Sequence, residues 1–157
     1  MTSTVVVTAL FDASSDDVWH AATASSTLHH VAAPMVLFEP VNPPSLPARW
    51  EDGDYLCALR LFGFLPIGQQ VIGISYPPPE GETRFLRDNG HSASIKRWDH
   101  WVSVTPEGNG TRYQDRLEID AGWRTPVVAA FAKAFYTHRQ ARLRKLVTGG
   151  LRKEEAA

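Results

Sequence analysis

The residues with the clearest chemical potential are a histidine and an aspartate in two neighbouring segments of the chain. His100 lies in residues 95–104, IKRWDHWVSV, and Asp115 lies in residues 111–119, TRYQDRLEI. A carboxylate that accepts a hydrogen bond from one imidazole nitrogen fixes the tautomer of the ring and raises its basicity. The second ring nitrogen could then exchange a proton near neutral pH, which suits enolisation or an aldol-type cyclisation.

The two segments alternate apolar and polar residues, as strands do when successive side chains point to opposite faces. Asn109 and Gly110 lie between them and supply the positive φ of a tight reversal, so the sequence predicts an antiparallel hairpin. With Thr105 opposite Gly110, His100 would lie opposite Asp115 on the more apolar face of this hairpin. The same register places two further pairs on that face: Trp98 with Leu117, and Val102 with Tyr113. This face is expected to be the wall of a lined cavity.

The pair of His100 and Asp115 has a simpler interpretation beside the chemical one. Most buried polar groups are simply paired, so a hydrogen-bonded histidine and carboxylate could anchor the hairpin without touching a ligand. Trp98 and Tyr113 would flank the pair with ring surface and one donor each. Such rings suit an aromatic ligand and suit a packed core equally well.

Four further residues are candidates for contact with a ligand. Arg60 is the single charge in the apolar run 55–64, where its guanidinium could bind a carboxylate or a carbonyl, or could face solvent. Phe131, Phe135 and His138 fall at helical spacing near the end of the chain. His138 could meet the polar end of a ligand, or it could be a satisfied histidine of the core.

The rest of the chain predicts an α+β fold that could hold these residues. We expect strands at 4–11, 35–39, 55–64, 69–76 and 83–88 besides the hairpin, with a break at 65–68, short helices after Ser14 and over 25–31, and a long amphipathic helix over 127–147 that ends at Gly149–Gly150. A single long helix laid across an open antiparallel sheet covers one face of it. A curved sheet around one helix leaves a hollow in which ligands commonly bind.

Length and composition indicate one ordinary globular domain. The chain has 157 residues, 43% apolar and 21% charged, and we expect a single domain over 1–157 with an ordered core over about 4–148. Cys57 is the only cysteine, so no internal disulfide can form. Residues 1–5 lack the basic flank and apolar region of a signal peptide. Both observations favour the cytoplasm.

Charge and motifs exclude several classes of partner and cofactor. A formal net charge of -1 gives no broad field for nucleic acid, and no apolar run reaches the ~20 residues that insert into a membrane. The basic residues near the end of the chain are interpreted as a solvated helix face: Arg139, Arg142, Arg144, Lys145, Arg152 and Lys153. The six histidines show no metal-ligand spacing, and no glycine-rich loop fits a nucleotide. We therefore expect no metal and no cofactor.

Several segments resemble the SRPBCC superfamily, also called START-like or Bet v 1-like proteins. These are Ser14–Trp19 after the first strand, the turn Trp50–Gly53, Gly63–Gly68, and Trp98-Asp99-His100 with its partner Thr111–Asp115. The last two resemble a bacterial subgroup of polyketide cyclase-like or ligand-binding members. The resemblance implies a helix-grip fold, in which a seven-stranded antiparallel sheet wraps around the C-terminal helix and leaves a tunnel for lipids, sterols, polyketides or aromatic metabolites.

Three functions are consistent with these features, and the sequence favours a binding protein over an enzyme. The first is a carrier or sensor of a small hydrophobic or aromatic ligand, bound by Trp98, His100, Tyr113, Asp115, Arg60, Phe131, Phe135 and His138. The second is an aromatase- or cyclase-like enzyme, a cyclase/dehydratase that would act on a polyketide through His100, with Asp115 orienting the ring. The third is a protein-interaction module that offers its sheet edge or basic helix to a partner, and a homodimer is also open.

Overall fold

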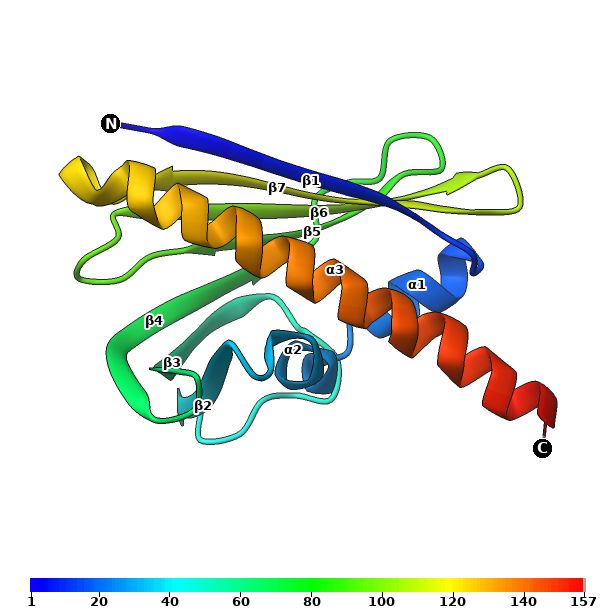
Figure 1. Cartoon of the computed structure of the whole chain (residues 1–157), viewed down its shortest axis with the longest axis horizontal. Coiled ribbons are helices and arrows are strands. Elements are labelled where there is room, and N and C mark those ends of the chain that lie inside the picture. Colours follow the sequence, from blue (N-terminus) through cyan, green and yellow to red (C-terminus); the bar gives the residue numbers. More distant parts are fainter. Residues whose placement is uncertain (157) are drawn as a thin grey trace.

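The chain folds into one curved antiparallel sheet and a long helix that crosses its inner face (Figure 1). The computed structural model describes residues 1–156, and the side chains of residues 1–148. Its elements in chain order are β1 (Ser3–Phe11), α1 (Ser15–Ala22), α2 (Ser25–Ala32), β2 (Val36–Asn42), β3 (Gly53–Leu61), β4 (Leu65–Ser75), β5 (Arg84–Gly90), β6 (Arg97–Glu107), β7 (Gly110–Asp120), a 3-10 turn (Gly122–Arg124) and α3 (Thr125–Ala156).

The seven strands are arranged in the order β1-β7-β6-β5-β4-β3-β2, and all neighbours are antiparallel. In Figure 1, α3 runs alongside β1 and β7, while α1 and α2 lie on the same side of the sheet as α3. The predicted α+β class and helix-grip arrangement are therefore confirmed. The core lies between the sheet and these helices, and α3 contributes Ala132, Phe135, Tyr136 and Leu143 to it.

Local sequence accounts for the elements that carry the site. Ser14 caps α1, because its hydroxyl accepts a hydrogen bond from the backbone nitrogen of Asp17 at 3.1 Å. Along β6 and β7, apolar and polar residues alternate, and the apolar set is buried. This period of two directs one face of each strand inward.

The hairpin of β6 and β7 forms, but its predicted register is wrong by two residues. Glu107 pairs with Gly110, so His100 lies opposite Leu117 and Val102 lies opposite Asp115. The same shift places Trp98 opposite Ile119 and Val104 opposite Tyr113. The strands continue to a loop of only two residues, and Gly108, with φ of 59°, takes the left-handed position that the sequence analysis gave to Asn109-Gly110. Because the shift is even, every side chain keeps its predicted face.

Two predicted boundaries also differ from the structure. The break between β3 and β4 falls at residues 62–64 and not at 65–68, since Phe62 and Gly63 adopt positive φ and reverse the chain before Leu65. The last helix continues past Gly149 to Ala156. Glycine inside a helix costs only about 1 kcal/mol, so a pair of glycines does not have to end one. None of the helices over residues 1–156 is both long and apolar enough to cross a membrane.

Candidate functional site

A cavity of about 540 Å³ lies between the inner face of the sheet and α3. Its walls come from α1, α2, six strands and α3, and most of its lining is apolar, including Leu28, Val31, Leu59, Ile72 and Leu86. Sites for small organic ligands have volumes of about 300–1,000 Å³ and a similar apolar character. The cavity is thus large enough to hold such a molecule.

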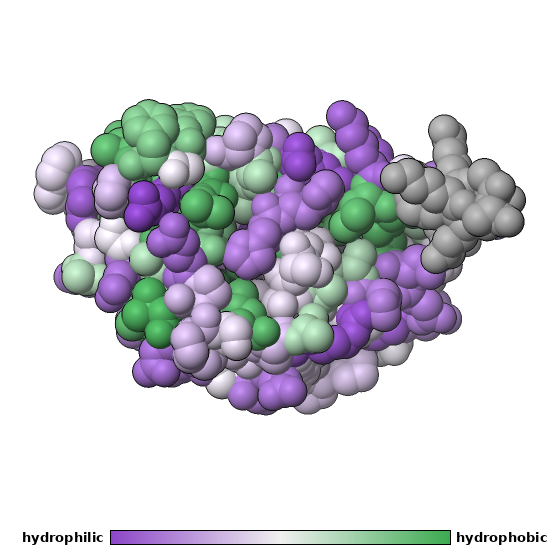
Figure 2. Space-filling model, turned by 90° about the horizontal axis from the view of Figure 1, so that it is seen from below, coloured by the Kyte–Doolittle hydropathy of each residue, from purple (hydrophilic) through white to green (hydrophobic). Residues whose placement is uncertain are grey.

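The cavity reaches the surface at one end of the molecule. Ile67 on β4 and Val127 on α3 line it, yet they are 47% and 75% exposed. Phe62 and Phe64, in the turn before Ile67, are exposed as well. Seen from below in Figure 2, apolar side chains reach the surface at several places, most of them toward the left. An apolar ligand therefore has an apolar opening on the surface.

A hydrogen-bonded group of three side chains lies in the cavity wall. His100 Nε2 donates to Asp115 Oδ1 at 2.6 Å, and Gln140 Nε2 donates to Asp115 Oδ2 at 2.9 Å. Gln140 also reaches the backbone oxygen of Val7 at 2.7 Å. Both carboxylate oxygens are thus engaged, by β6 on one side and by α3 on the other. The His100 ring packs against Tyr136 with centroids 4.5 Å apart, so the group is held rigidly.

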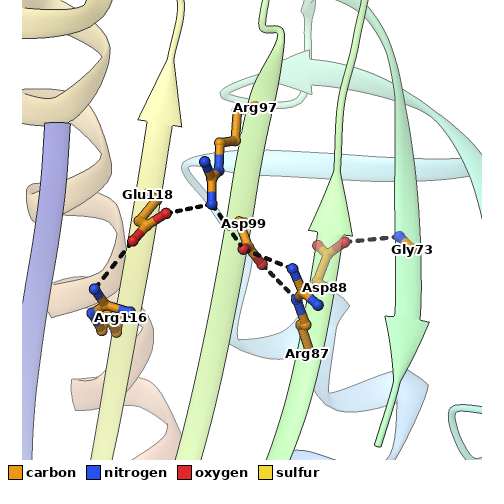
Figure 3. A network of polar contacts seen from close by, with 7 residues as sticks. All are labelled: Gly73, Arg87, Asp88, Arg97, Asp99, Arg116 and Glu118. Atoms are coloured by element: carbon orange, nitrogen blue, oxygen red, sulfur yellow. Dashed lines mark hydrogen bonds and ion pairs between the residues drawn. The ribbon is translucent and has the colours of Figure 1, made fainter. Parts of the chain in front are cut away.

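Asp88 adds a second carboxylate to the cavity, beside His100. It lies opposite His100 in the pairing of β5 with β6, and its Oδ1 accepts a hydrogen bond from the backbone nitrogen of Gly73 at 2.8 Å (Figure 3). Burial raises the pKa of Asp88 to about 6, although the neighbouring His100 and the hydrogen bond from Gly73 lower it in part. The carboxyl group of Asp88 therefore titrates closer to neutral pH than an ordinary aspartate.

Arg139 lines the cavity, where the sequence analysis placed it on a solvated helix face. Its guanidinium carbon lies 5.0 Å from the ring centroid of Tyr136 and 5.6 Å from that of Phe135. The correction follows from helix geometry, since residues three and four apart share a face and Phe135 and Tyr136 are buried. The same spacing brings Gln140 to the cavity and could have identified both residues. Both residues lie in a run of basic residues, which favoured a solvated face over a cavity-facing one.

Six of the eight predicted site residues line the cavity, and two do not. The six are Trp98, His100, Tyr113, Asp115, Phe131 and Phe135. Arg60 instead lies 3.3 Å from the carboxylate of Glu39, with both side chains nearly half exposed. His138 Nε2 contacts the backbone oxygen of Ala33 at 2.7 Å, which fits the structural interpretation of that residue. Sequence reasoning missed Asp88, Tyr136, Arg139 and Gln140.

Solved structures of the same fold show which class of protein this arrangement defines. A START superfamily protein from Mycobacterium smegmatis aligns at 15% identity with a TM-score of 0.59, covering 93% of this chain and 97% of that one. Protein CV1439 from Chromobacterium violaceum aligns at 16% identity and 0.63, covering 92% and 96%. Norcoclaurine synthase from Thalictrum flavum, in complex with dopamine and hydroxybenzaldehyde, aligns at 10% and 0.64, covering 95% and 88%. The chain thus has the START-like, Bet v 1-like fold that its sequence resembles.

Within that fold class, the chain belongs to a family described as a domain of unknown function, DUF8410, whose model matches residues 9–147. No curated protein matches the sequence. The matched range includes all seven strands in whole or in part and most of α3, so the cavity lies within the part of the chain that defines the family.

Proposed function

We propose that this protein binds a small, mostly apolar molecule in the cavity between the sheet and α3, as a carrier or sensor. The observation that carries the proposal is the cavity of about 540 Å³ with its largely apolar lining. Burial of apolar ligand surface there contributes roughly 25 cal/mol per Å² removed from water. The apolar opening beside Ile67 and Val127 supports the same function, because it offers an apolar ligand a route from the surface.

The similar structures support a ligand of this class. One is a START superfamily protein, and the norcoclaurine synthase structure holds dopamine and hydroxybenzaldehyde, which are small aromatic molecules. Lipids, polyketides and aromatic metabolites of comparable size are candidates for this chain. The rigid group around Asp115 would give such a ligand a fixed polar contact at one point of an otherwise apolar wall.

Filling the cavity tests the proposal. Val102 is buried on the cavity wall, and Val102→Phe would occupy space that a ligand needs. We expect this variant to bind the neutral fluorophore N-phenyl-1-naphthylamine at least about tenfold more weakly than wild type, as measured by fluorescence titration. The matched control is Val6→Phe, at a residue that is 49% exposed and does not line the cavity, and its affinity should be unchanged. Equal binding by both variants would contradict the proposal.

A cyclase-like enzyme that uses His100 is the second candidate, and one observation favours it. Nε2 of His100 is bonded to Asp115, while Nδ1 has no hydrogen bond to any of the described residues and His100 lines the cavity. A bound ligand could therefore exchange a proton with Nδ1. In a catalyst, His100→Ala would abolish turnover of a bound polyketide and leave its binding, whereas in a carrier the same change would alter only the affinity.

A further inference from the structure

Arg139 differs from the other arginines near it on α3. Arg142 Nε donates to the backbone oxygen of His30 at 2.7 Å, and Arg144 Nη2 donates to that of Leu10 at 3.3 Å. Arg139 makes no hydrogen bond and no ion pair with any residue that the structure describes. The Arg139 side chain is partly buried and lines the cavity, and a guanidinium has five N–H donors. Arg139 therefore presents unused donors to the cavity.

The position of the Arg139 guanidinium is nevertheless well defined. The rings of Tyr136 and Phe135 lie 5.0 and 5.6 Å from its central carbon, a separation at which a cation is attracted to an aromatic ring. Both rings precede Arg139 on the same helix, so they hold one side of the cation. The guanidinium is thus pre-organised for a partner that the described residues do not supply.

The groups around Arg139 favour its charged form without occupying its donors. Burial acts to lower the pKa of the guanidinium, but the phenols of Tyr136 and Tyr113 and the carboxylates of Asp115 and Asp88 outweigh it and raise the pKa. Both carboxylates are farther than 4.0 Å from Arg139 and have other partners. Asp115 is bonded to His100 and Gln140, and Asp88 to the backbone of Gly73.

The geometry points to a carboxylate on the ligand as the partner of Arg139, so that the cavity takes amphipathic carboxylic acids with an aliphatic or aromatic body. This inference rests on the proposed binding function and specifies its ligand class. A planar guanidinium matches a carboxylate through two parallel N–H···O bonds. A doubly charged phosphate fits less well, since one arginine would have to offset two charges in the presence of Asp88 and Asp115. The apolar remainder of the cavity would hold the body of the acid.

A pair of competitors that differ in one group tests this inference. Decanoate and 1-decanol have the same chain length, and each would be titrated against the protein with N-phenyl-1-naphthylamine bound. In wild type we expect decanoate to displace the fluorophore at about tenfold lower concentration than 1-decanol, because only the acid offers a charge-assisted partner to Arg139. Arg139→Gln should reduce this preference to about threefold or less. Lys133→Gln removes an exposed charge from the same helix outside the cavity and should leave the preference intact.

The possible results separate this inference from the binding function on which it rests. If the fluorophore binds but wild type does not prefer decanoate, the inferred carboxylate on the ligand is overturned. If Arg139→Gln keeps the preference, the role of Arg139 as its partner is overturned. In both cases the cavity still binds apolar molecules. If neither the fluorophore nor either competitor binds, the binding function fails and the carboxylate fails with it. Binding of the fluorophore to Arg139→Gln with near wild-type affinity would show that this variant is folded. If the variant does not fold, the preference of wild type for decanoate over 1-decanol still tests whether the ligand carries a carboxylate.

Discussion

The outer and inner faces of β5, β6 and β7 both carry charged side chains but use them differently. On the outer face, Arg87, Asp99, Arg97, Glu118 and Arg116 form a continuous ladder of opposite charges across the three strands (Figure 3). On the inner face, Asp115 is hydrogen-bonded to His100 and Gln140, and Asp88 to the backbone nitrogen of Gly73. Arg139, on the same side, has no polar partner among the described residues. The outer charges are therefore paired with one another, while on the inner face the guanidinium of Arg139 remains available to a ligand.

Two aspartates at almost the same level of the sheet show this difference in their proton affinities. Asp99 on the outer face accepts two hydrogen bonds from Arg87, at 2.8 and 2.9 Å. Burial alone would raise the pKa of Asp99, but the bonds and charge of Arg87 and the charge of Arg97 lower it below its usual range. Burial raises the pKa of Asp88 on the inner face. Neighbouring strands thus carry carboxyl groups whose contributions to stability change with pH in opposite directions.

The largest expected change in the free energy of unfolding comes from breaking the hydrogen-bonded group of His100, Asp115 and Gln140. Asp115→Ala leaves His100 and Gln140 without their buried partner, and the loss of one member of a buried pair costs about 3–5 kcal/mol. Urea unfolding at pH 7 would measure it. Glu118→Ala on the outer ladder is the matched control and should cost less than about 1 kcal/mol, because its arginine partners are half exposed. Similar costs for the two variants would remove the distinction between the faces.

A somewhat smaller change in stability, in the stabilising direction, is expected from a substitution at Asp88. Its folded pKa of about 6 exceeds the ordinary value of 3.8, so the folded protein binds this proton more tightly than the unfolded chain does. Stability from this group is present at low pH and is lost as the pH rises from about 4 to 6. Asp88→Asn should therefore stabilise the protein by up to about 3 kcal/mol at pH 7. Urea unfolding between pH 4 and 7 checks this, and a variant less stable than wild type at pH 7 would contradict it.

The smallest effect in this series is expected at Asp99. Asp99→Asn weakens the paired hydrogen bonds to Arg87 and should cost about 1–2 kcal/mol at pH 7. The pKa of Asp99 is lowered, so its contribution is fully present above about pH 4 and is lost as the pH falls through the folded pKa. The loss of stability in Asp99→Asn relative to wild type should therefore become smaller at low pH. The gain in stability in Asp88→Asn should become smaller there as well. A cost that is independent of pH would exclude the ion pair as its source.

The face of each residue in the hairpin of β6 and β7 could be predicted from the sequence, whereas its exact partner could not. Period-two alternation correctly directs His100 and Asp115 inward, because alternation depends only on the strand itself. Register depends on the length of the loop, and loops of two and of four residues satisfy the same alternation. The pair still meets, since the hydrogen bond runs diagonally between residues that are not directly opposite.

The polar residues that α3 brings to the cavity were harder to predict for a different reason. Arg139 belongs to a run of basic residues, and composition favours a solvated face for such a run. Only the buried neighbours Phe135 and Tyr136 distinguish it, and their burial is a property of the tertiary structure. Asp88 lacks a local signal altogether, since it follows an arginine in a short strand whose inner face is set by pairing with β6.

The even register shift of the hairpin has a consequence for how this family can vary through evolution. Lengthening or shortening the turn after Glu107 by two residues changes which residues pair but returns every side chain to its own face. A change of one residue carried into β7 as a register slip would turn Asp115 outward and bring a neighbour such as Gln114 into the cavity. Selection on the cavity should therefore tolerate turns that differ by two residues and eliminate those that differ by one unless a bulge absorbs the difference.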